Sequence, residues 1–128
     1  MPTRRACGVG VALALALAGQ AAAEDAQQTC QAVTVIAQAF KADVGTWRDR
    51  LTRNDGVEVI CPIMTVQFKR FLNTRTPDKD WRDRQRAGWN ASVCRDRVWR
   101  PAIEAGWIIL LSITTASGEG ADIIASCD

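Results

Sequence analysis

Four cysteines constrain the fold of this chain more than any other feature, because they are spread almost evenly along it. Cys30, Cys61, Cys94 and Cys127 are separated by 31, 33 and 33 positions. The spacing lacks the close pairs of a C-x-x-C redox motif or a zinc site, and the sequence contains no histidine to complete a metal site. An even number of distant cysteines instead favours two structural disulfides in a chain that reaches an oxidising compartment.

The first 23 residues have the pattern of an export signal. Two arginines at positions 4 and 5 are followed by a ten-residue apolar run from Val9 to Ala18, whereas a membrane-spanning helix needs roughly 20 apolar residues. Small residues at positions 21–23 fit a signal-peptidase site. We therefore predict a cleaved signal peptide at 1–23 and an exported, periplasmic or secreted domain at 24–128 that does not span the membrane. A retained, uncleaved anchor is the alternative.

Export makes disulfides the expected state of the four remaining cysteines, but three connectivities are open to them. We expect Cys30–Cys61 and Cys94–Cys127, because each pair then joins a helix to a strand in the same half of the chain. Each bond would close a loop of about 30 residues and contribute about 3 kcal/mol through the unfolded state. A domain this small needs such support because its core buries limited apolar area.

Hydrophobic periodicity predicts one small α+β domain with the order α-β-β-α-β-β, in which helices pack on an antiparallel sheet of about four strands. A first helix to about residue 44 is indicated by the helical spacing of Val33, Ile36, Ala37, Phe40 and Val44. A second helix opens after Pro77, and its core face is expected to contain Ala87, Ala91, Cys94 and Val98. Asp96 is expected to cap a further short helix that stops at Gly106.

The strands are predicted as two pairs. Residues 47–53 and 57–66 would form a hairpin around Asn54-Asp55-Gly56, with Pro62 at an edge or bulge. Residues 68–72 are interpreted as a short helical turn. Ile108–Leu111 is apolar at every position, which predicts a central strand covered on both faces by helices or by another subunit. Residues 117–120 would form the turn into a last strand that ends at Cys127.

Charge is unevenly distributed although the predicted mature chain is neutral. The whole sequence has 16 basic and 14 acidic residues, and two of the basic residues lie in the leader. The segment from Lys69 to Arg100 contains ten basic and four acidic residues, so the remainder of the mature chain is acidic. A basic total therefore gives no argument for nucleic acid as a partner, and export argues against it.

Candidate catalytic groups are few, because the sequence contains neither histidine nor tyrosine. This removes the usual general base near neutral pH and the common nucleophilic triads. Asp78, Asp80 and Asp83 are close enough in sequence to form an acid–base pair or a calcium site, but first-turn acids also stabilise a helix N-terminus. We favour the helix interpretation and predict a protein with no catalytic residues, no metal and no cofactor.

The most suggestive segment interleaves arginine with tryptophan between residues 81 and 100. Both residue types are common at interfaces, yet tryptophans in a small domain usually enter its core while arginines extend over them into solvent. The candidate binding surface consists of Arg82, Arg86, Trp89, Arg95, Arg97, Trp99 and Arg100. In the alternative, the tryptophans are buried in the core and the arginines extend over them into solvent.

Three functions are compatible with these features. The first is a disulfide-stabilised, non-catalytic accessory or binding protein of the bacterial envelope, which would bind an envelope or secreted protein or an anionic envelope component. The second is an inhibitor or immunity-type protein that acts on an extracytoplasmic enzyme. The third is a hydrolase that uses the carboxylates at positions 78, 80 and 83. The sequence leaves the oligomeric state open.

Overall fold

The computed structural model describes residues 29–128, so the predicted signal peptide at 1–23 lies outside the described residues. The chain divides into two compact units, residues 1–33 and 34–128. The described part of the first unit, residues 29–33, is helical and includes the buried Val33. The second unit contains helical residues 34–41 and all of the elements that follow.

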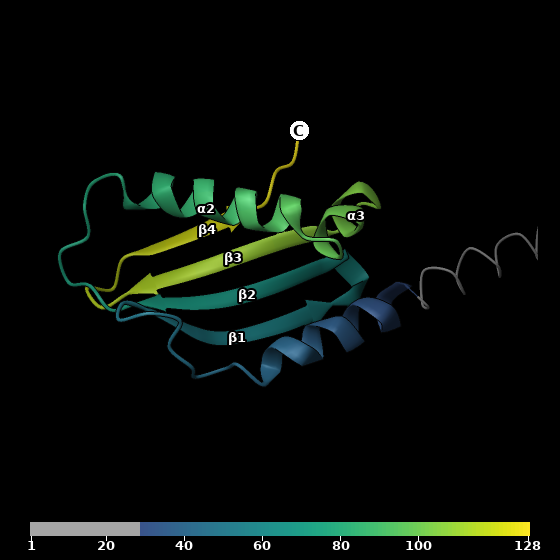
Figure 1. Ribbon diagram of the computed structural model, residues 1–128, viewed down its shortest axis with the longest axis horizontal. Coiled ribbons are helices and arrows are strands. Elements are labelled where there is room, and N and C mark those ends of the chain that lie inside the picture. The colour runs from purple at the N-terminus through teal and green to yellow at the C-terminus, as the bar shows by residue number, and fades with distance from the viewer. Residues whose placement is uncertain (1–28) are drawn as a thin grey trace, which may run out of the picture. The chain divides into compact units, whose positions relative to one another are not determined.

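The second unit is built on a four-stranded mixed sheet (Figure 1). Its strands are β1 (Thr52–Ile60), β2 (Thr65–Leu72), β3 (Ile108–Thr115) and β4 (Gly120–Ile124), in that spatial order. The outer pairs β1/β2 and β3/β4 are antiparallel, whereas β2 and β3 are parallel. The predicted α+β class and the number of strands are confirmed, but the purely antiparallel sheet is wrong.

The parallel pair has a simple cause in the connection between β2 and β3. Helix α2 (Trp81–Arg95) and helix α3 (Trp99–Glu104) lie in that connection. A crossover through helices returns the chain to the end at which β2 began, so the next strand runs in the same direction. Leu111 therefore pairs with Phe68 in parallel register.

One face of the sheet is buried and the other is largely open. Along β3, Ile109, Leu111 and Ile113 are at most 2% exposed, whereas Ile108 on the opposite face is 39% exposed. The parallel register places Val66, Phe68 and Arg70 on the buried face. The prediction that β3 is central is correct, but within the described chain its second face is not covered.

Helix α2 packs against the sheet through a different face from the one predicted. Its buried residues are Trp81, Trp89 and Val93, which recur at multiples of four positions. The expected stripe is wrong, because Ala87, Ala91 and Val98 are exposed. Indole rings bury far more apolar area than alanine methyl groups, so they determine which face of the helix turns inward.

The first two strands meet at a different turn from the predicted one. Asn54-Asp55-Gly56 lies inside β1, where the register shifts between Asn54 and Gly56 as at a β-bulge. The reversal occurs instead at the short 3-10 helix η1 (Cys61–Ile63), followed by Met64 in the left-handed conformation. Residues 68–72 belong to β2 and not to a helical turn. Pro62 is accommodated in η1, where its missing N–H removes no ladder hydrogen bond.

Other local predictions agree with the structure. Asp96 Oδ1 accepts hydrogen bonds from the backbone N–H groups of Val98, at 2.8 Å, and Trp99, at 3.1 Å, at the start of α3. Gly106 follows α3 with φ +102°, a conformation that favours glycine, and Gly118 adopts φ +86° in the β3–β4 turn.

All four cysteines among residues 29–128 are in disulfide linkage. Cys94 at the end of α2 is bonded to Cys127 after β4, as the sequence predicts. Cys30 and Cys61 are the other two linked cysteines, also as predicted. Between residues 29 and 128, no helix has the length and apolar character needed to cross a membrane.

Candidate binding groove

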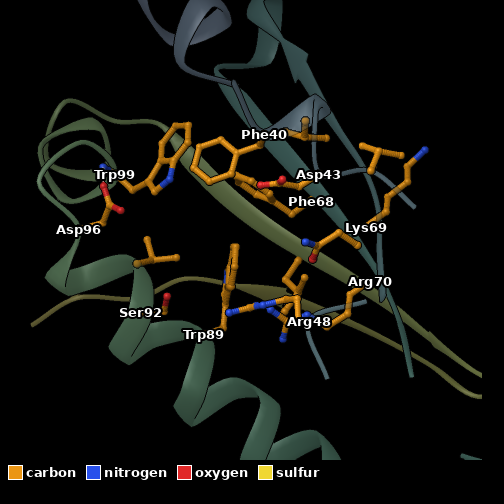
Figure 2. Close-up of a pocket in the computed structure, with 16 residues that line it drawn as sticks. Phe40, Asp43, Arg48, Phe68, Lys69, Arg70, Trp89, Ser92, Asp96 and Trp99 are labelled. Carbon is orange, nitrogen blue, oxygen red and sulfur yellow. Dashed lines mark hydrogen bonds between the residues drawn. The ribbon is translucent and has the colours of Figure 1, made fainter. Parts of the chain in front are cut away.

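A groove of about 280 Å³ opens on the helix-covered side of the sheet (Figure 2). Its floor includes Phe68 of β2 and Leu111 of β3, and α2 contributes Trp89 and Ser92. The opposite wall comes from the end of helical residues 34–41 and the turn after it, including Phe40, Asp43 and Val44. The groove therefore lies where two helical segments leave part of the sheet uncovered.

Four aromatic side chains form a cluster in this groove, and Phe68 is at its centre. The ring centroid of Phe68 lies 5.6 Å from Phe40, 5.3 Å from Trp89 and 5.6 Å from Trp99, all in edge-to-face arrangements. The Trp89 indole N–H also donates to the carbonyl of Ile109 at 3.3 Å. Such contacts hold the rings in place, so this aromatic cluster (Phe40, Phe68, Trp89 and Trp99) forms a fixed apolar surface.

The apolar face of the first helix is only partly covered. Ala37 is 1% exposed, but Phe40 is 40% exposed and Val44, in the turn that follows, is 43% exposed. Both of these residues belong to the helical spacing that predicts a core face, and both line the groove. The uncovered residues add apolar surface beside the aromatic cluster.

The other end of the groove is basic. Arg70 follows Val66 and Phe68 on the inward face of β2, and its Nη1 donates to Gln85 Oε1 at 2.8 Å. Burial lowers the pKa of Arg70 to about 10, and the nearby positive charge of Arg48 acts in the same direction, while Asp49 opposes it. Arg48, Lys69 and Arg70 all line the groove.

The residues of the predicted Arg/Trp surface are distributed over two different environments. Trp89, at 8% exposure, and Trp99, at 4%, are buried and contribute to the groove wall. The five arginines are exposed on or beside α2 and α3, at positions 82, 86, 95, 97 and 100. Trp89 and Trp99 are thus buried, whereas the arginines that neighbour them in sequence are exposed to solvent.

Several of these arginines have local partners. Arg82 Nε donates to the carbonyl of Gly120 at 3.1 Å, and its guanidinium lies 4.6 Å from the ring centroid of Trp81. Arg86 forms an ion pair with Asp83 at 3.5 Å, and Arg100 forms one with Glu104 at 3.4 Å. These contacts indicate that the arginines form a solvated outer surface of the helices.

The carboxylates considered for catalysis lie in exposed ion pairs. Asp78 lies 2.9 Å and Asp80 3.9 Å from Arg84, and Asp83 pairs with Arg86. Among residues 29–128, no group of three or more potential metal ligands is gathered into a site. The three aspartates therefore do not converge on a common cavity in the described structure.

The sequence pattern does not identify Phe68 and Arg70 as groove residues, because it favours a helical turn at residues 68–72, which belong to β2. In strand alternation, Val66, Phe68, Arg70 and Leu72 share one face, and a charged residue in an otherwise apolar register is the signal that could have identified the basic end. Arg48 had no such local signal. It joins the groove only through the turn between the first helix and β1.

Comparison with known proteins gives a likeness of fold. No family model and no curated protein matches the sequence. A crystal structure of a candidate secreted protein from Pseudomonas aeruginosa superposes with a TM-score of 0.64 at 14% identity, over 78% of this chain and 90% of that chain. EpsS, a pilotin from the Vibrio vulnificus type 2 secretion system, superposes with a TM-score of 0.66 at 13% identity, over 80% of this chain and 92% of its own. At these identities the likeness establishes the α+β fold.

Proposed function

We propose that this protein is an exported, disulfide-stabilised accessory protein of the bacterial envelope, without catalytic activity, that binds an apolar segment of an envelope protein in the groove. The observation that carries the proposal is the half-exposed pair Phe40 and Val44, which lines the groove together with the buried rings of Trp89 and Trp99. Exposed apolar groups that adjoin a concave surface are typical of protein-interaction sites.

The size of the groove limits the kind of occupant. A volume of about 280 Å³ accommodates a few side chains but not a folded domain. An amphipathic helix can insert residues from one face into such a groove, using positions three or four apart. A short amphipathic segment of a larger protein therefore fits the groove better than a globular surface does.

The comparisons support this class of function without identifying the partner. Both similar structures come from proteins linked to export, and one is a secretion-system pilotin. Components of envelope secretion machinery are consequently the first partners to test. The four linked cysteines and the export-signal pattern at residues 1–23 support an oxidising compartment outside the cytosol.

The proposal is tested by capturing envelope proteins with immobilised oxidised protein and with the Val44→Glu variant. We expect the wild-type protein to retain one envelope protein, whose binding segment, mapped with overlapping peptides, is short and amphipathic. Val44→Glu should reduce peptide affinity at least tenfold, because it places a charge against the aromatic cluster.

Val35→Glu is the matched control, since Val35 is 67% exposed on the helix that precedes Val44 and does not line the groove. It should bind the peptide like the wild type. Equal affinity of the Val44→Glu variant, or a mapped segment without apolar residues, would refute binding in the groove.

A further inference from the structure

The basic end of the groove contains two arginines, Arg48 and Arg70, and the negative charge of Asp49 acts on Arg70 without forming an ion pair with it. Within residues 29–128, neither Arg48 nor Arg70 forms an ion pair. Arg70 Nε is buried and has no hydrogen-bond partner in this part of the chain. A buried N–H without an acceptor is costly.

The neighbouring acidic groups are already engaged. Asp49 Oδ1 accepts hydrogen bonds from the backbone N–H groups of Leu51 and Thr52, both at 2.8 Å, and the bond from Leu51 is the main cause of its lowered pKa. Arg84, at the edge of the adjoining hollow, pairs with Asp78 at 2.9 Å. Within residues 29–128, Arg48, Arg70 and the exposed Lys69 are therefore the cations lining the groove that form no ion pair.

Acidic groups in the groove lie toward its other end. Asp96 caps α3 next to Trp99, and Asp43 follows Phe40, whereas Arg48 and Arg70 lie near Trp89 (Figure 2). The guanidinium of Arg70 lies 5.9 Å from the ring centroid of Trp89. The groove is therefore apolar with acidic neighbours at one end and basic at the other, which gives a bound segment a preferred direction.

We infer that Arg48 and Arg70 form a carboxylate-binding subsite, and that the envelope segment bound in the groove carries an acidic side chain that enters it. This inference rests on the proposed function. Paired guanidinium groups match the geometry and charge of a carboxylate, and an anion between them offsets their mutual repulsion. Ser92 and Gln85 lie at the same end and contribute further polar groups.

The surroundings favour a side chain over a chain terminus as the source of the carboxylate. An adjoining hollow of about 370 Å³ shares Arg48, Arg70 and Trp89 with the groove. Open space thus continues past the two arginines. A segment can run on through it while one acidic side chain reaches inward.

The subsite can be tested without knowing the partner, using 4-phenylbutyrate and its neutral amide as probes. The phenyl ring matches the aromatic cluster, and only the acid provides a carboxylate. Binding is measured by NMR titration of the full oxidised protein, following the indole N–H signals of Trp89 and Trp99. We expect the amide to bind about tenfold more weakly than the acid, as for loss of one charged hydrogen-bonded contact.

Variants assign the effect to the arginines. Arg48→Gln should weaken binding of the acid several-fold and leave the amide unchanged. Arg50→Gln removes the same charge two positions away, from an exposed residue that lines neither the groove nor the adjoining hollow, and should have no effect. Arg70→Lys keeps the charge but loses the fork of donors, so it should weaken the acid alone.

The outcomes separate the subsite from the groove. Equal affinity for acid and amide, or no binding of the acid, would overturn the carboxylate subsite. Equal effects of Arg48→Gln and Arg50→Gln would do so too, because they would show a non-specific charge effect. The proposed function would then be judged by the Val44→Glu comparison alone, since that comparison does not involve either arginine.

Discussion

At the scale of single residues, burial and exposure within the aromatic cluster separate a structural role from a binding role. Phe68 contacts three rings, whereas Phe40 contacts two and is 40% exposed. Trp89 and Trp99 are buried, so they position the groove and are not free surface groups. Phe68 therefore contributes mainly to stability, and Phe40 mainly to the accessible apolar surface.

Alanine substitutions should reveal this difference. Phe68→Ala is expected to lower the free energy of unfolding by about 2–4 kcal/mol, because it removes a central ring and leaves a cavity. Phe40→Ala should lower it by less than about 1.5 kcal/mol, since part of its ring is already in water. Urea unfolding followed by tryptophan fluorescence measures both values. Equal losses would show that the cluster is not organised around Phe68.

At the scale of elements, helices α2 and α3 start in different ways. Asp96 caps α3 through two backbone hydrogen bonds, whereas Asp80, at the N-cap position of α2, makes no side-chain capping bond. A short helix such as α3 has few internal hydrogen bonds, so its cap is a large part of its stability. The longer α2 is held instead by its buried tryptophans.

Removal of each carboxylate tests this contrast. Asp96→Ala should destabilise the protein by about 1 kcal/mol, the usual cost of losing an N-cap. Asp80→Ala removes only an exposed ion pair with Arg84 and should cost less than about 0.5 kcal/mol. Thermal unfolding of the oxidised proteins provides the comparison. A larger loss for Asp80→Ala would contradict the assignment of Asp96 as the cap.

At the scale of the whole molecule, a small core is combined with covalent links. The second unit buries one face of a four-stranded sheet, and Cys94–Cys127 holds the chain after β4 to the end of α2. A bond that closes a loop of 33 residues contributes about 3 kcal/mol in the chain-entropy model. That contribution depends on an oxidising compartment, so the stability of the fold and the proposed export are linked.

Processing and oxidation can be examined together in protein recovered from the periplasmic or extracellular fraction. We expect an intact mass that begins at Glu24, and no alkylation of cysteine unless a reductant is added. The physical reason is that the thiols pair only after the chain leaves the reducing cytosol. Recovery of the full-length precursor, or of four alkylated cysteines without reductant, would contradict export with cleavage at this site.

The sequence alone was sufficient for the features that depend on local pattern. Helical spacing predicts the first helix, the Asp96 cap and Gly106 mark the limits of α3, and the cysteines at 94 and 127 predict a bond that the structure contains. These features succeed because each depends on residues close in sequence or on a chemistry with few alternatives.

Tertiary structure alone decided the direction of the strands and the position of the groove. The bulge at Asn54–Gly56 replaces an apparent turn, and the crossover through α2 makes β2 and β3 parallel. That register turns Arg70 inward, beside an arginine 22 positions away in sequence. Strand pairing and the choice of buried helix face depend on how side chains distant in sequence pack into one core. Local periodicity does not determine that packing, so the sequence pattern could not predict it.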